Sequence, residues 1–231
     1  MNKIIIILGT AHLSTTLGKC APDGSLRECE YSREIVKRVS SALRGKGYQV
    51  FVDYEPLQPS DAIRSRHQSK EQQRELDHRV KVVNSLCQSF GAQNCLYVSI
   101  HVNAAGNGSS WMQAGGWSAY TTVGKTKSDT LAECLYNAAQ IHLSEYAKQM
   151  EEGKVKGVYS SKQRPIRKDV ADGDSDIESN FYVLRKTLCP AVLTENLFQD
   201  NKADVAFLLS EKGKEAISQI HIDGIIKYIQ L

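Results

Sequence analysis

The chain has 231 residues, of which 41% are hydrophobic and 24% charged, and its formal net charge is +3 at pH 7. These ordinary values predict a globular protein with a sizeable core. The charge is too small to indicate a nucleic-acid-binding protein. No apolar run is long enough for a membrane span, and the short run after Met1 lacks the cleavage site of a signal peptide.

Strands and helices are predicted to alternate along the chain. Apolar runs rich in β-branched residues predict buried strands at residues 4–8, 48–52, 96–101, 117–123 and 190–195. Apolar residues at helical spacing predict helices at about 27–43, 71–90, 128–150 and 212–229. We expect one three-layer α/β domain over residues 1–231, with a mostly parallel central sheet flanked by helices. The segment 151–179 has little pattern and is predicted to be a long loop.

The six cysteines are scattered and contain no C-x-x-C pair. Two of them, Cys95 and Cys189, lie in or beside predicted strands, where small thiols are commonly buried. Free thiols are therefore predicted, in keeping with folding in a reducing compartment.

Three side chains suited to metal binding or acid–base chemistry lie where predicted strands end. His12 follows the first strand, His101 closes the third, and Glu195 closes the strand near the C-terminus. Parallel α/β sheets bind their ligands at the carboxyl ends of the strands. The three side chains are therefore expected at one edge of the sheet.

A hydrolytic zinc site needs three protein ligands and an open position for water, so the two histidines need a partner. Glu28 and Glu30 are the candidates. Glu28 precedes Tyr31 by three residues and Ile35 by seven, on the predicted buried stripe, whereas Glu30 is in phase with the solvated face. An inward carboxylate in the first turn of a helix is well placed for a cation. Spacing alone leaves structural, hydrogen-bonded histidines as the alternative.

The other four histidines have simpler interpretations. His142 and His221 lie on the apolar stripes of their helices and are predicted to be buried or half-buried. His67 and His78 occur in charged sequence and are predicted to be solvated.

Four sequence blocks occur in a fixed order along the chain. They are Ala11-His12, Glu28 at a helix start, Ser99-Ile100-His101-Val102-Asn103-Ala104 and Pro190-Ala191-Val192-Leu193-Thr194-Glu195. Together they resemble the zinc-dependent N-acetylmuramoyl-L-alanine amidases of the amidase-3 family, over nearly the whole length, with features of phage-type and Bacteroidetes-type members. The first block departs from the family's usual Gly-His-Gly-Gly, because Ala11 precedes the histidine and Leu13 follows it.

The resemblance implies a site at the C-terminal edge of the strands. One Zn²⁺ ion would be held by His12, Glu28 and His101, and Glu195 would be the catalytic acid–base residue. The implied reaction is hydrolysis of the amide that joins the lactyl group of N-acetylmuramic acid to L-alanine of the stem peptide. Peptidoglycan is then the partner, and neither nucleic acid nor a membrane is expected.

Substrate contacts are expected from four further residues. Asn103 and Arg79 fit the family pattern, and Trp111 and Trp117 could line a groove, because aromatic faces suit both sugars and peptides. Packing within the loop is the alternative for the two tryptophans.

Two other functions are weighed against the amidase. A zinc carboxypeptidase or other metallopeptidase is disfavoured because the H-x-x-E pair is absent. A wall-binding module without catalysis would have no use for Glu195 beside three metal ligands. With no export signal evident, we expect a protein made in the cytoplasm that acts on the cell wall, as a phage or prophage lysin does.

Overall fold

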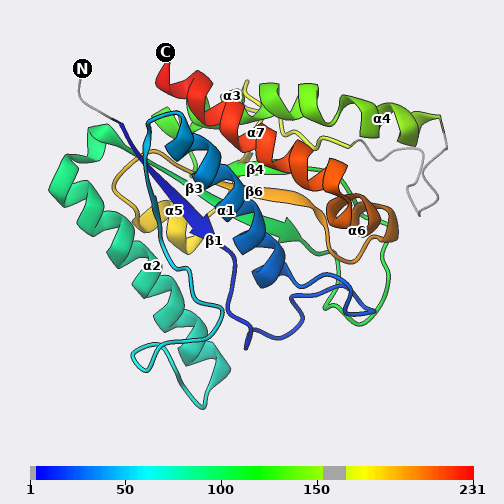
Figure 1. Ribbon diagram of the computed structural model, residues 1–231, viewed down its shortest axis with the longest axis horizontal. Helices are drawn as coiled ribbons and strands as arrows, with labels where there is room; N and C mark the ends of the chain where they lie inside the picture. Colours follow the sequence, from blue (N-terminus) through cyan, green and yellow to red (C-terminus); the bar gives the residue numbers. More distant parts are fainter. Residues whose placement is uncertain (1–3, 153–164) are drawn as a thin grey trace.

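The computed structural model describes residues 4–152 and 165–231, and within them one sheet has the strand order β2-β1-β3-β6-β4-β5 (Figure 1). The strands are β1 Ile5–Thr10, β2 Gln49–Val52, β3 Cys95–Asn103, β4 Ser118–Thr121, β5 Ile177–Glu178 and β6 Ala191–Phe198. All neighbouring strands are parallel except the antiparallel pair β4–β6. The predicted, mostly parallel sheet is confirmed.

Helices cover both faces of this sheet, which gives the predicted three layers (Figure 1). One face packs against α1 (Glu28–Gly45), α3 (Lys127–His142) and α7 (Glu211–Ile229), and the other against α2 (Gln68–Phe90) and α5 (Tyr182–Lys186). The remaining helices are α4 (Ser144–Glu151), α6 (Lys202–Leu209) and the short 3-10 helix η1 (Ala92–Asn94).

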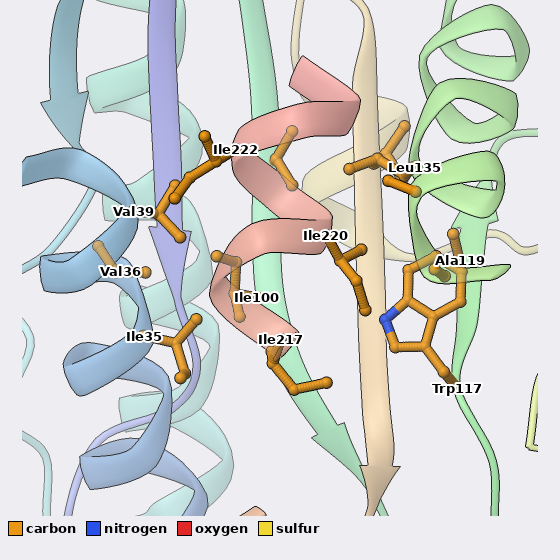
Figure 2. Packing of buried hydrophobic residues seen from close by; sticks show 14 of the residues in the cluster. Ile35, Val36, Val39, Ile100, Trp117, Ala119, Leu135, Ile217, Ile220 and Ile222 are labelled. Atoms are coloured by element: carbon orange, nitrogen blue, oxygen red, sulfur yellow. The ribbon is translucent and has the colours of Figure 1, made fainter. Parts of the chain in front are cut away.

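Two apolar layers arise from the alternation of side chains along each strand. In β1, Ile6 and Leu8 face α1 and α7, whereas Ile5 and Ile7 face α2. Figure 2 shows the larger layer, in which Ile220 of α7 lies over the sheet among residues of α1, α3 and the strands. Burial on both faces explains why β1, β3 and β6 are nearly continuous apolar runs in the sequence.

The predicted helix at residues 128–150 is instead two helices, because the helical conformation is interrupted at Leu143, between α3 and α4. Leu143 is fully buried, and its side chain belongs to the larger apolar layer. The short elements α5, α6 and β5 were not predicted, since a few residues carry too little periodicity. Residues 153–164 of the predicted long loop lie outside the described residues.

All six cysteines are free thiols in the structure, and five of them are buried. Among the described residues, no helix is both long and apolar enough to span a membrane.

Candidate metal centre

The adjacent strands β1 and β3 bring His12 and His101 together. The register pairs Thr10 with Ile100, so both histidines emerge at the carboxyl edge of the sheet. Their ring centroids lie 5.1 Å apart with the rings nearly perpendicular, at 89°. The two histidines therefore lie side by side, as their positions at strand ends predicted.

Glu28 reaches this pair from the first turn of α1. Its side chain is only 1% exposed, and its Oε1 accepts a hydrogen bond from the Val102 backbone N–H at 3.1 Å. The same oxygen lies 3.0 Å from Nδ1 of His101, while Oε2 lies 3.5 Å from Nε2 of His12. Glu30, by contrast, is half-exposed and forms a salt bridge with Arg27. Burial of the two glutamates thus follows the helical phase.

These three side chains fit a metal ion. One donor atom from each of His12, Glu28 and His101 lies within 4.8 Å of the other two, and no other such group of three occurs in residues 4–152 and 165–231. Oε2 of Glu28 is buried without a hydrogen-bond donor, which is costly unless a cation faces it. Two imidazole nitrogens and a carboxylate oxygen are a zinc-type ligand set.

Burial also sets the charge states at this centre. It lowers the pKa of His12 to about 3, so the imidazole is neutral near pH 7, which is the form that binds metals. Burial opposes the charge on Glu28, but the two histidines lower the pKa of its carboxyl below the ordinary value. The site therefore presents the neutral imidazole of His12 beside the anionic carboxylate of Glu28.

Glu195 of β6 lies opposite His101 in the β3–β6 register. Burial and the nearby charge of Glu28 raise its pKa well above that of an ordinary glutamate, and its Oε2 has no hydrogen-bond donor. A carboxylate whose pKa is raised is a stronger base than an ordinary glutamate, which suits it to proton transfer. The structure thus gathers the four residues that the strand ends and helical phase indicated.

The His12 backbone is held in an unusual conformation, with φ +41° in the left-handed region. Arg33 stabilises this turn by donating hydrogen bonds from Nη1 to the carbonyls of Ala11 and His12. Ser32 accepts from the Ala11 N–H and donates to the Ile100 carbonyl. Neither Arg33 nor Ser32 was predicted from the sequence, although a serine on the buried stripe of α1 could have indicated such a role.

A cavity of about 220 Å³ opens beside the four residues. It is lined by His12, His101 and Glu195, and Lys19 supplies a cationic side chain. The rest of its wall comes from α2, α5 and the neighbouring strands, namely Gln72, Glu75, Leu76, Arg79, Ser99, Phe181, Tyr182, Val183 and Leu193. A substrate that enters this cavity meets the two histidines and the glutamate together.

Comparison with known proteins agrees with this geometry. The model of the Amidase_3 family, N-acetylmuramoyl-L-alanine amidase, matches residues 6–227. The chain belongs to this amidase family. The endolysin of Bacillus phage SPP1 is 27% identical over 234 residues, which cover 100% of this chain and 68% of that protein.

Solved structures share the fold of this amidase. An N-acetylmuramoyl-L-alanine amidase from Clostridium difficile 630 superposes with a TM-score of 0.70 at 18% identity, covering 100% of this chain and 98% of the other. The CwlD amidase from Clostridioides difficile, solved in complex with the GerS lipoprotein, gives 0.70 at 19% identity and covers 99% of both chains. As a member of the Amidase_3 family, the enzyme is a peptidoglycan amidase, which hydrolyses the bond between N-acetylmuramic acid and L-alanine.

Arg79 of the amidase lines the cavity, but its guanidinium forms salt bridges with buried carboxylates. It is 3% exposed and forms salt bridges of 2.8 Å with both Asp53 and Glu75. Burial opposes its charge, yet the two carboxylates raise the pKa of Arg79 above the ordinary value. A further hydrogen bond to Thr10 places Arg79 under the end of β1. These contacts give Arg79 a structural role, and its contact with substrate stays a prediction.

The structure corrects the groove prediction for Trp117. Its side chain is fully buried in the larger apolar layer (Figure 2). It packs edge-on against Tyr136 and donates from Nε1 to Oδ1 of Asn196. Asn196 in turn donates to the carbonyl of His101 at 2.8 Å. Trp117 thus belongs to the core, and it helps to position His101 through Asn196. Asn196 was not among the site residues predicted from the sequence.

Trp111 and Asn103 also lie away from the cavity wall. Trp111 packs partly against the core, and the Lys202 ammonium lies 5.5 Å from its ring centroid. Asn103 ends β3, where its side-chain oxygen accepts a hydrogen bond from the Ala104 N–H. Neither residue lines the cavity beside His12 and Glu195, and their substrate contacts stay predictions.

Proposed function

We propose that this amidase is a zinc enzyme in which His12, Glu28 and His101 hold the ion and Glu195 transfers the proton. The convergence of three donor atoms within 4.8 Å carries the proposal. Glu195 remains free for chemistry, because three protein ligands and water complete a tetrahedral zinc.

Zinc bound at this site would supply Lewis acidity, polarising the scissile carbonyl and lowering the pKa of the attacking water. Glu28 contributes through its position. One of its oxygens is fixed by the Val102 N–H, so the other stays directed toward His12. The helix start thereby orients the carboxylate before any ion arrives.

Glu195 is the proton carrier in the proposed reaction. Its carboxylate accepts a proton from water as the water oxygen attacks the lactyl carbonyl carbon. The same proton then passes to the alanine nitrogen as the C–N bond breaks, so the carboxylate is regenerated. The raised pKa of Glu195 suits both transfers.

We further propose that the enzyme acts as a lysin made in the cytoplasm, with the cell wall as its target. The similarity to the endolysin of Bacillus phage SPP1 supports this setting. Muramyl peptides of peptidoglycan are then the substrates.

Mass spectrometry of digested peptidoglycan tests the proposed chemistry. We expect stem peptides with a free L-alanine amine and glycans with a free lactyl carboxylate, together with about one zinc ion per chain. Cleavage between stem-peptide residues would instead indicate a metallopeptidase. Wall binding without any released amine would indicate a non-catalytic module.

A further inference from the structure

A second group of acidic residues lies outside the metal centre, immediately before β5. Asp172, Asp174 and Asp176 alternate with Gly173 and Ser175. The carboxyl groups of Asp172 and Asp174 lie within hydrogen-bonding reach of each other, as do those of Asp174 and Asp176. Calcium-binding loops supply carboxylates from alternate positions in this way.

Asp176 provides an independent observation, because it is buried and has an unsatisfied oxygen. Asp176 is 2% exposed, and its Oδ2 accepts a hydrogen bond from the Thr121 hydroxyl. Oδ1 is buried with no hydrogen-bond partner, and the same holds for Oδ1 of Asp174. Two facing carboxylates with unpartnered oxygens cannot satisfy each other, since an ionised carboxylate only accepts.

The charges around this pair are negative. Burial and, after it, the charges of Asp174 and Asp129 raise the pKa of Asp176 to about 6. In residues 4–152 and 165–231, no lysine, arginine or histidine forms a salt bridge with the three aspartates. The nearby ammonium of Lys168 donates to the Ser175 hydroxyl instead. Buried carboxylates without a counter-charge are costly.

We propose that Asp174 and Asp176 bind a calcium ion between their facing carboxylates, with Asp172 as a further ligand. The donors here are all oxygens, which favours a hard cation over zinc. Calcium takes six to eight oxygen ligands in irregular geometry, so water and backbone carbonyls can complete the shell. The three aspartates do not bring three donor atoms within 4.8 Å of one another, so Asp172 has to move toward the ion to become its ligand.

This calcium site would hold the outermost strand of the sheet and the cavity wall that follows it. β5 pairs with β4 through Ile177 opposite Tyr120. The Tyr120 ring packs on Phe181, with centroids 5.3 Å apart, and Phe181 lines the catalytic cavity. Calcium would therefore stabilise the fold at a place that shapes substrate binding.

Calorimetric titration of the purified protein with calcium chloride tests the proposal directly. We expect saturable binding of one calcium ion per chain. The melting temperature should rise by about 5–10 °C at a calcium concentration 100-fold above Kd. The same ionic strength of sodium chloride should leave the melting temperature unchanged. Binding and melting are measured without substrate, so the result does not depend on the proposed zinc chemistry.

Asp174→Asn and Asp172→Asn should weaken calcium binding at least tenfold, whereas the exposed Asp61→Asn should bind as wild type does. The exposed Asp172 keeps the test usable if Asp174→Asn folds poorly. Absence of calcium binding in the wild type would overturn the proposal. Loss of the calcium response in Glu28→Gln would also overturn it, because the ion would then bind at the histidines. Calcium-independent stabilisation by Asp176→Asn would instead indicate two carboxyls that share a proton.

Discussion

The hydroxyl of Ser32 donates a hydrogen bond of 2.6 Å to the backbone carbonyl of Ile100, joining α1 to β3. The same oxygen accepts a hydrogen bond of 2.8 Å from the Ala11 N–H. Ala11 and Ile100 directly precede His12 and His101. One buried side chain therefore sets the spacing of the two strand ends that carry the histidines.

Ser32→Ala should lower the free energy of unfolding by about 1–3 kcal/mol, because it leaves a buried N–H and a buried carbonyl without their partner. It should also weaken metal binding, since the histidines lose their fixed spacing. Urea unfolding and competition with a chelator measure the two effects. Ser40→Ala is the matched control, as this buried serine of α1 donates only to Lys37 in its own helix. Equal metal loss in both variants would contradict the role of Ser32.

Glu28→Gln should lose most of its zinc, whereas Glu30→Gln should retain it. The reason is that Glu28 points toward the histidines and Glu30 points toward solvent and Arg27. Elemental analysis of the two purified variants makes the comparison. Zinc retention by Glu28→Gln together with loss by Glu30→Gln would reverse the ligand assignment.

Glu195→Gln should depress the catalytic rate by about 10²–10⁴-fold while leaving zinc content and melting temperature near wild type. The amide cannot accept the proton, but it fills the same space. Single-turnover cleavage of a muramyl peptide measures the rate without product release. A rate near that of wild type would remove Glu195 from the mechanism, and loss of zinc would make it a ligand.

Arg79→Met should lower the free energy of unfolding by roughly 3–5 kcal/mol, because it leaves the buried carboxylates of Asp53 and Glu75 without a counter-charge. Thermal and urea unfolding give the measurement. The exposed Lys81→Met on the same helix serves as the control and should unfold like wild type. A stable Arg79→Met with a raised KM would instead restore the expected substrate contact.

Acid should destabilise the protein partly through His221. This residue is fully buried, and burial lowers the pKa of its imidazole to about 4. The unfolded chain takes up this proton near pH 6.5, so stability present above that pH is lost as the pH falls toward 4. The loss attributable to His221 is about 3 kcal/mol. Unfolding of His221→Gln across this range should show a shallower acid slope, and the exposed His67→Gln should match wild type.

The sequence predicted the parts of the site that depend on local patterns. β1, β3 and β6 are long apolar runs because both faces of the sheet are covered, so the positions of His12, His101 and Glu195 at strand ends could be inferred. Burial of Glu28 followed from the 3.6-residue period of α1.

Residues whose environment comes from distant segments were harder to place. The sequence around Trp117 suits an exposed loop as well as a strand, and only its partners Tyr136 and Asn196 settle its burial. Arg79 likewise looks like a free cation until Asp53, 26 residues away, meets it under β1. Such pairings are tertiary, and local periodicity does not encode them.

The order of the strands has a consequence for how activity arises. Glu195 belongs to β6, the strand that lies between β3 and β4, although it comes last of the six along the chain. A nascent chain that ends before β6 holds both histidines and Glu28 but has neither the proton carrier nor the strand that joins the two halves of the sheet. Pairings this distant in sequence form late and slowly. We therefore expect the enzyme to stay inert during synthesis and to become active only when β6 has paired with β3 and β4.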